Sequence, residues 1–315
     1  MKDFRTAAVV FPLVASLLVA CGGGERTTST DTAGNQGRTR PITVKGSDTM
    51  VILGQRFAEE YMKQNPGTVI QVNGGGSGTG IAALINGTVD LAQSSRAMSD
   101  AEKASVEKQR SAQVVETPVA LDTLAVFVNA SSPVRQMTIE QVRNIYMGKV
   151  TNWNQVGGPN STIVIYGRES SSGTYDYFRE HVLDEGDFSP RVQTLAGTAA
   201  IINAVSKDPN GIGYGGIAYS KDATALALSE GAGPAVAPSE TSVADGTYPL
   251  SRNLYFYTLS TASDSILRFV EWTISPAGQA VVENVGYFPL NQPATAGSDT
   301  TATETAAAGA DAAAQ

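Results

Sequence analysis

Short apolar runs alternate with amphipathic segments through the middle of the chain. The runs are four to six residues long and predict seven strands, at 42–45, 69–73, 91–94, 114–119, 124–129, 163–167 and 254–259. Between the first two runs, Leu53, Phe57 and Tyr61 recur at four-residue spacing, which predicts a helix over 49–64. Strands that alternate with helices in this way are typical of an α/β fold.

Two further helix starts carry a capping pattern. Ser99 and Glu102 stand three residues apart, as do Thr138 and Gln141, which is the spacing of a capping box. Both pairs lie between predicted strands, so each is expected to open a helix that connects two strands of the sheet.

The first twenty residues have the pattern of an export signal. Lys2 and Arg5 precede an apolar run over 7–20, which is shorter than the roughly 20 residues that a membrane-spanning helix needs. The run ends at Leu18-Val19-Ala20-Cys21, which resembles the lipobox of bacterial lipoproteins. That resemblance implies cleavage before Cys21 and acylation of its thiol. A plain secretory signal or a transmembrane anchor is the alternative.

The segments that flank the central part are poor in large apolar residues. Residues 21–40 are rich in Gly, Thr and Ser and predict a flexible tether. Residues 293–315 are mostly Ala, Thr, Asp and Gly and predict a disordered tail, with an Ala-rich helix as the alternative. The part between them, 41–292, is large enough for two domains of ordinary size.

Composition removes several classes of function. The 315 residues include one Cys and one His, too few for a multi-His zinc site, a cysteine cluster or a disulfide framework. The net charge of −8 opposes non-specific attraction to nucleic acid or to an anionic bilayer. A small anion is not excluded, because a local cluster of donors can hold it against an unfavourable net field.

Glycines and hydroxyls gather where predicted strands end and predicted helices begin. Three such loops occur, at 45–49, 74–80 and 168–174. Ligands bind at this edge of an open α/β sheet, where helix starts present unpaired N–H groups and the positive end of the helix dipole. One such loop alone fits ordinary capping and turn chemistry. Three together, with Arg168 in the last, favour a site for an anion.

Other motifs for phosphate chemistry or catalysis fail on spacing. The 74–80 run lacks G-x-G-x-x-G, and no Walker-type G-x-x-x-x-G-K-[ST] occurs. Ser77 does not lie in G-x-S-x-G, and His181 falls on a predicted helix among charged neighbours, so a hydrolase triad is unsupported. The acidic group at 184–187 lacks the ligand spacing of a calcium loop. We therefore expect no catalytic residue, no metal and no cofactor.

These loops and several later segments together resemble the PstS-type phosphate-binding proteins of bacterial phosphate importers. The resemblance covers essentially all of 41–292. The residues that carry it are Gly46-Ser47-Asp48-Thr49, Gly76-Ser77-Gly78-Thr79-Gly80-Ile81, Asp90-Leu91-Ala92-Gln93-Ser94-Ser95-Arg96, Ile145-Tyr146-Met147-Gly148-Lys149-Val150-Thr151-Asn152-Trp153, Arg168-Glu169-Ser170-Ser171-Ser172-Gly173-Thr174, Gly211-Ile212-Gly213-Tyr214, Tyr248-Pro249-Leu250-x-Arg252 and Ser275-Pro276-x-Gly278-Gln279.

The resemblance implies a two-lobed type II periplasmic-binding fold with two interlobe crossovers and the ligand in the cleft. The crossovers are expected near 118–122 and 248–253, so that 41–118 and 249–292 form lobe I and 119–248 forms lobe II. Carried over by position, the ligand-binding residues are Ser47, Asp48, Thr49, Ser77, Ser95, Arg96, Arg168, Ser172, Gly173 and Thr174. Oxygens bonded to both lobes would stabilise the closed form selectively.

Ser95 bears on the selectivity of such a site. Some members of the family carry Asp at this position, where it accepts the proton of hydrogen phosphate and repels sulfate. Here Arg96 follows Ser95, so Arg96 and Arg168 are the two candidate cations, with a structural salt bridge as the alternative for Arg96. Asp48 or Glu169 is the candidate for the missing acceptor, unless each only caps its helix start.

The resemblance implies a lipid-anchored extracytoplasmic receptor that captures inorganic phosphate and delivers it to an ABC permease. We expect a monomer, attached to the membrane through its N-terminal lipid only, with no nucleic-acid partner and no enzymatic activity. The alternatives are a receptor or sensor for another tetrahedral oxyanion, a secreted phosphatase-like hydrolase, and a purely adhesive surface protein. A hydrolase would need a nucleophile activated by a base or a metal, which the sequence does not offer.

Overall fold

The computed structural model describes residues 40–290, so the predictions for the signal, the acylated Cys21, most of the tether and the tail lie outside the described residues. The main sheet follows the path β2-β1-β3-β11-β4-β8-β6-β7, and β9 pairs with β4. β5 and β10 form a separate parallel pair. The strands are β1 Ile42–Gly46, β2 Ile70–Asn73, β3 Leu91–Ser94, β4 Val114–Val128, β5 Gln136–Thr138, β6 Val164–Arg168, β7 Gln193–Leu195, β8 Gly211–Gly216, β9 Thr224–Ala225, β10 Ala227–Ser229 and β11 Ser251–Leu259.

Helices cover both faces of this sheet. The α-helices are α1 Val51–Gln64, α2 Ser77–Ile85, α3 Asp100–Arg110, α4 Ile139–Tyr146, α5 Gly173–His181, α6 Thr198–Lys207, α7 Glu240–Ala244, α8 Asp264–Thr273 and α9 Pro276–Val285. Three 3₁₀ turns complete the set: η1 Asp48–Met50, η2 Trp153–Val156 and η3 Ile217–Asp222. Among the described helices, none is both long and apolar enough to cross a membrane.

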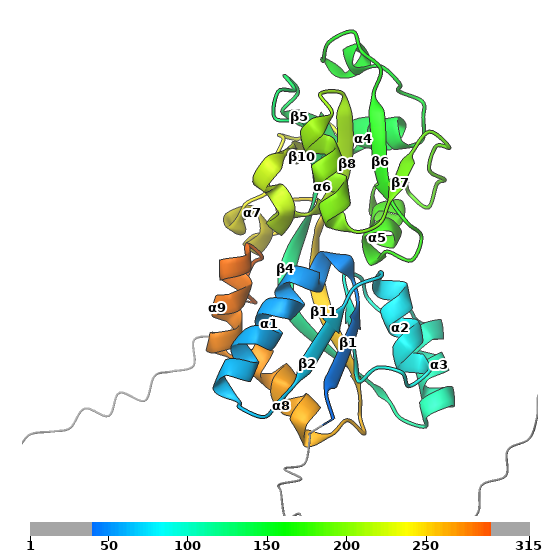
Figure 1. Ribbon diagram of the computed structural model, residues 1–315. Helices are drawn as coiled ribbons and strands as arrows, with labels where there is room; N and C mark the ends of the chain where they lie inside the picture. The colour runs from blue at the N-terminus through cyan, green and yellow to red at the C-terminus, as the bar shows by residue number, and fades with distance from the viewer. Residues whose placement is uncertain (1–39, 291–315) are drawn as a thin grey trace, which may run out of the picture. The chain divides into compact units, whose positions relative to one another are not determined.

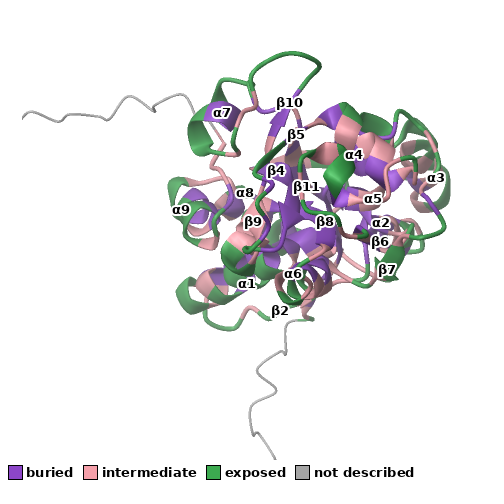
Figure 2. Ribbon diagram, turned by 90° about the horizontal axis from the view of Figure 1, so that it is seen from above, coloured by how far each residue is buried: buried purple, intermediate pink, exposed green. Residues whose placement is uncertain are grey.

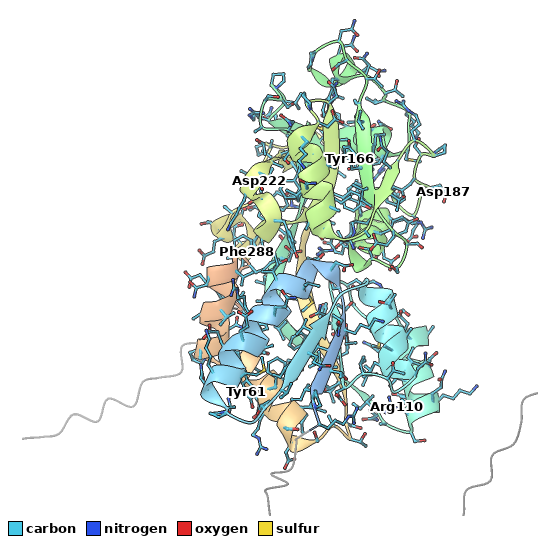
Figure 3. All side chains as sticks on the ribbon, in the orientation of Figure 1. Tyr61, Arg110, Tyr166, Asp187, Asp222 and Phe288 are labelled. Atoms are coloured by element: carbon cyan, nitrogen blue, oxygen red, sulfur yellow. The ribbon has the colours of Figure 1, made fainter. Side chains whose placement is uncertain are left out.

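The first structural region surrounds β1, β2, β3 and β11. Helices α1, α8 and α9 pack on one side of these strands, around Phe57, Phe256 and Phe269. Helices α2 and α3 pack on the other side, against Ala92 and Tyr257 (Figure 1). Tyr61 on α1 and Arg110 at the end of α3, both labelled in Figure 3, mark these two sides. The apolar faces of five helices therefore bury the strands on both sides, as an α/β sheet requires.

The second region surrounds β8, β6 and β7. β8 runs parallel to β6 and antiparallel to β4. Helices α4 and α5 bury Tyr146, Phe178 and Trp153 on one face, and α6 packs Ile201 and Val205 on the other. Figure 2 shows the buried residues concentrated along β4, β8 and β11, where the two regions adjoin.

The two regions share the long strand β4. Its first part pairs with β11 up to Thr123, and its last part, from Leu124, pairs with β8. The sequence predicted two strands here, and the structure joins them into one strand of 15 residues. Pro118, within the first of the two predicted strands, is accommodated by a register shift opposite Leu254 and Tyr255, because proline has no N–H to donate to a regular ladder.

The other predicted elements are largely confirmed. The predicted strands at 42–45, 69–73, 91–94, 163–167 and 254–259 correspond to β1, β2, β3, β6 and β11, and both capping boxes are formed. The helix predicted over 49–64 begins as the 3₁₀ turn η1 before α1. Strand β8 was missed because its glycines hide the apolar pattern. Gly213 and Gly215 are needed there, since an added Cβ would lie 2.6 Å from Ile201 or Thr198 of α6.

Candidate anion-binding site

The three glycine- and hydroxyl-rich loops do lie at helix starts. The first joins β1 to η1, the second precedes α2, and the third joins β6 to α5. η1 is held from outside by two tyrosines: Tyr219 donates to the Asp48 carbonyl at 2.9 Å, and Tyr287 donates to the Thr49 carbonyl at 2.5 Å. The loops that follow β1 and β6 are more than a hundred residues apart in sequence, and they meet through side-chain contacts between Thr49 and Thr174 and between Asp48 and Arg168.

Four buried hydroxyl groups form the centre of this meeting. The Oγ1 atoms of Thr49 and Thr174 are 2.8 Å apart. The Oγ of Ser95 lies 3.4 Å from Thr174 Oγ1 and 3.4 Å from Ser77 Oγ, and the Ser95 N–H donates to Ser77 Oγ at 3.2 Å. All four residues are fully buried. The structure thus brings together these four predicted ligand residues, two of them from helix starts; we call them the hydroxyl cluster.

Two of the remaining predicted residues, Ser172 and Gly173, border the hydroxyl cluster, and a third, Ser47, lies two residues before Thr49 in the chain. Ser47 is buried immediately before η1, and its side chain makes no capping bond to that turn. Ser172 is the N-cap of α5, where its Oγ accepts from the N–H groups of Thr174 and Tyr175. Gly173 lies against the cluster, because an added Cβ would overlap Ser77 Oγ and lie 3.0 Å from Ser95 Oγ.

The guanidinium of Arg168 is the buried cation beside the hydroxyl cluster. Its side chain has no solvent exposure. Nη1 donates to Thr198 Oγ1 at 3.0 Å, and that hydroxyl lies 3.4 Å from Thr49 Oγ1. Nη2 donates to Asp48 Oδ2 at 2.9 Å, so Arg168 reaches across from β6 to η1. The Tyr214 hydroxyl accepts from the Arg168 backbone N–H at 3.2 Å and holds the end of the strand.

Asp48 and Glu169 are both partners of Arg168. Asp48 accepts from Arg168 through Oδ2 and from the Gly75 N–H through Oδ1, at 2.8 Å. Glu169 accepts from Nη2 at 2.9 Å and from Nε at 3.2 Å. Burial works to raise the pKa of Glu169, but the hydrogen bonds and charge of Arg168 lower this pKa below its usual value. Both carboxylates are therefore bound to the cation that the sequence proposed for the ligand.

Arg96 is not brought to the hydroxyl cluster through its guanidinium. Nη1 and Nη2 donate to the two carboxylate oxygens of Glu102, each at 2.8 Å, and Nε donates to Asp176 at 2.8 Å. The hydrogen bond with Glu102 raises the pKa of Arg96, although burial opposes this. Asp176 belongs to α5, so this arginine links the two regions as a salt bridge, which is the alternative left open by the sequence.

Three residues at the site were missed by sequence reasoning. Thr198 begins α6 after Gly197, which is the same glycine–hydroxyl pattern at a helix start, but the polar strand β7 before it gave no apolar run. Asp122 and Arg252 form a buried pair: Arg252 Nε and Nη2 donate to Asp122 Oδ2 at 3.0 and 2.8 Å. A lone carboxylate inside an apolar strand, as at Asp122, was the available signal.

Comparison with known proteins places this geometry in a family. The profile of a family described as "PBP superfamily domain" matches residues 26–277. The phosphate-binding protein PstS of Pseudomonas aeruginosa is 38% identical over 264 residues, which is 78% of this chain and 81% of that protein. The chain belongs to the PstS family of phosphate-binding proteins. The family assignment expected from the sequence is therefore confirmed.

Other PstS relatives agree on family and on fold. The protein SphX of Synechococcus elongatus is 33% identical over 79% of this chain and 77% of its own length. A putative phosphate ABC transporter substrate-binding protein of Clostridium perfringens, solved with bound phosphate, has a TM-score of 0.73 at 26% identity and covers 80% of this chain and 100% of its own. The two-lobed type II fold is thus confirmed, and the PstS family is one of substrate-binding proteins rather than enzymes.

Proposed function

We propose that this protein captures inorganic phosphate between its two lobes and delivers it to an ABC importer. The observation that carries the proposal is the hydroxyl cluster: buried hydroxyls from lobe I, at Thr49, Ser77 and Ser95, meet Thr174 of lobe II beside the buried Arg168. Uncharged donors and a guanidinium are the groups that hold a desolvated oxyanion.

The ligand set proposed for phosphate follows from the same geometry. The residues are Ser47, Asp48, Thr49, Ser77, Ser95, Arg168, Ser172, Gly173 and Thr174. The hydroxyls of the cluster now bond one another, and an oxyanion between them exchanges those bonds for bonds to its own oxygens. The N–H groups at the starts of α2 and α5 add donors and the positive ends of two helix dipoles.

Arg96 enters the proposal through lobe closure. Its bonds to Glu102 of lobe I and Asp176 of lobe II bridge the edge of the site, so it stabilises the closed arrangement rather than the ligand directly. The bond from the Gly78 N–H to the Ser171 carbonyl, at 3.0 Å, also joins the two lobes. Phosphate bound to both lobes adds to these contacts and shifts the protein toward the closed form.

The lobe boundaries are proposed at 118/119 and 248/249, with 41–118 and 249–292 in lobe I. The support is that the chain passes between the two regions in β4, which exchanges its partner β11 for β8 beyond Thr123, and again at the start of β11. A hinge on two strands leaves each lobe with its own hydrophobic core, so that the lobes can move as units.

The proposed setting is extracytoplasmic, with Cys21 as a lipidated N-terminal residue and a permease as the partner. The support is the lipobox pattern at 18–21 and the tether composition of 21–40. Mass spectrometry of the mature protein tests it: we expect an N-terminal diacylglyceryl-cysteine and release from membranes in a Cys21→Ala variant. A mature chain that retains residues 1–20, or starts elsewhere, contradicts this assignment.

The deciding experiment is isothermal titration of the mature chain, extracted in mild detergent and freed of carried-over ligand by partial unfolding and dialysis. We expect saturable one-to-one binding of phosphate at neutral pH and little response to sulfate. A folded chain that binds no phosphate contradicts the proposed ligand. Turnover of a phosphate monoester by the same sample would instead favour the hydrolase alternative.

A further inference from the structure

Arg252 is a second buried arginine at the hydroxyl cluster. It lies near the start of β11, where the two lobes meet, and its side chain is 3% exposed. Its Nη2 donates to Thr174 Oγ1 at 3.0 Å, so it is in direct contact with a member of the hydroxyl cluster. Arg96, the second cation that the sequence suggested, instead donates to Glu102, Asp176 and the Ala97 carbonyl.

The hydrogen bonds of Arg252 fix the direction of its guanidinium. Asp122 Oδ2 accepts from both Nε and Nη2 and therefore occupies the edge of the guanidinium between these atoms. The other N–H of Nη2 donates to Thr174 Oγ1. This N–H belongs to a different edge of the guanidinium, the one between Nη2 and Nη1. One face of the guanidinium is covered by the Tyr177 ring, with Cζ 5.3 Å from the ring centroid.

Nη1 of Arg252 is buried and has no hydrogen-bond partner among residues 40–290. A buried donor on a charged group is costly to leave unpaired, so such an atom usually faces a ligand or an ordered water. The edge formed by Nη1 and Nη2 is the one that binds oxyanions with two parallel bonds, and it faces the side of Thr174.

We propose that Arg252 is a direct ligand of the bound oxyanion and the second cation of the site, with Asp122 holding its guanidinium in place. This inference rests on the proposed function, since it assigns a further contact to the same ligand. Two buried guanidinium groups, Arg168 from lobe II and Arg252 from the crossover strand, would then face one anion. That arrangement favours a doubly charged over a singly charged oxyanion.

Few charged or titratable groups surround Arg252. Asp122 of β4 pairs with it, and Tyr177 of α5 covers one face. Arg168, with its partners Asp48 and Glu169, lies beyond Thr49 and Thr198. If substitution of Arg252 changes the preference of the site for doubly over singly charged phosphate, the change therefore reports on Arg252 itself. A second variant in which Asp122 is also neutralised separates this effect from that of leaving Asp122 unpaired.

The test is calorimetric titration of phosphate into the full mature chain at mildly acidic and mildly alkaline pH. The wild type is compared with Arg252→Gln, with the double variant Asp122→Asn/Arg252→Gln, and with Arg252→Lys. Arg110→Gln, which removes a remote arginine that donates to the Leu84 carbonyl, is the control. We expect both Gln variants to lose about 10- to 100-fold in affinity at alkaline pH, as for loss of a charged hydrogen bond.

At acidic pH, where phosphate carries a single negative charge, the loss should be several-fold smaller, and Lys should restore part of the affinity. A residue that only supports the structure would lower affinity equally at both pH values. If Arg252→Gln unfolds, the double variant decides, because it leaves no unpaired buried charge. If the wild type binds phosphate and the double variant binds it with the same affinity, this inference alone is overturned. That result is expected if a water molecule, rather than the oxyanion, accepts from Nη1. A wild type that binds no phosphate overturns it together with the proposed function.

Discussion

Arg168 and Arg96 are two arginines of the same site region with opposite surroundings. Each forms ion pairs with two carboxylates, one of them across the two lobes: Arg168 with Asp48, and Arg96 with Asp176. Arg168 has no side-chain exposure and donates its remaining bond to a hydroxyl, whereas Arg96 is 18% exposed and donates to Glu102 and a backbone carbonyl.

The difference shows what separates a ligand-binding arginine from a structural one. Nε, Nη1 and Nη2 of Arg96 each donate to a carboxylate, so an arriving anion would have to displace a carboxylate from any of them. Nε and Nη2 of Arg168 also donate to carboxylates, but its Nη1 does not. Arg168 has Thr198 as the acceptor of Nη1, and a hydroxyl yields this N–H to an anion at much smaller cost. Charge alone did not distinguish the two residues; the chemical nature of their acceptors does.

The largest effect on phosphate affinity is expected for Arg168→Gln. Removing one partner from a buried charge network costs several kcal/mol, so phosphate affinity should fall by about 100-fold or more. Arg96→Gln, which removes only a partly exposed salt bridge, should lower affinity by less than about 10-fold. Titration calorimetry of both variants measures this. Equal losses would show that the two arginines do the same work.

Gly173→Ala tests how closely the hydroxyl cluster approaches the start of α5. The added methyl group overlaps Ser77 Oγ, and overpacking of this size should lower phosphate affinity by about 10-fold or more. Gly78→Ala is the matched control, because its Cβ would lie 3.4 Å from the Ser171 carbonyl, an ordinary contact. Similar affinities for the two variants would mean that the ligand does not lie against Gly173.

Asp48→Asn and Glu169→Gln test whether the carboxylates that pair with Arg168 contribute to the selectivity for phosphate over sulfate. If either carboxylate accepts the proton of hydrogen phosphate, its neutral amide should narrow the preference for phosphate over sulfate by about 10-fold. The measurement is competition of the two anions at neutral pH, with Glu185→Gln, on an exposed turn, as control. An unchanged preference in both variants would make this account of selectivity wrong.

Glu102→Gln tests the ion pair between Arg96 and Glu102, which is more exposed than the ion pairs of Arg168. Burial works to raise the pKa of Glu102, but the bonds from Arg96 lower it, so the folded protein binds this proton less readily than the unfolded chain does. The stabilisation is therefore complete above the unfolded pKa of about 4.3 and disappears as the pH falls through the lower folded value. Gln preserves the capping box with Ser99.

We expect the Gln variant to lose at most about 1 kcal/mol of unfolding free energy at pH 7 and to match the wild type in strong acid. Denaturant unfolding across this pH range measures the effect. Glu107→Gln, on the same helix with its side chain exposed, is the control for loss of a carboxylate. A difference that persists in strong acid would show that Glu102 acts through packing.

Much of the local framework was predictable. The apolar runs predicted β1, β2, β3 and β6, and the capping pairs located the starts of α3 and α4, because these signals depend on residues within one turn or one strand. Strand β8 and the start of α6 were missed, since glycines and polar residues there serve contacts with other elements rather than an apolar pattern.

By itself, the sequence determined the α/β class, the three loops at helix starts and the small set of hydroxyls and arginines available to an anion. Only the tertiary structure decided which arginine faces the hydroxyl cluster. Arg96, Arg168 and Arg252 have equal charge and the same side-chain length, and each has one carboxylate acceptor that lies 80, 120 or 130 residues away along the chain, respectively. Hydrogen-bonding partners so distant are chosen by strand register and lobe packing, which local sequence patterns do not encode.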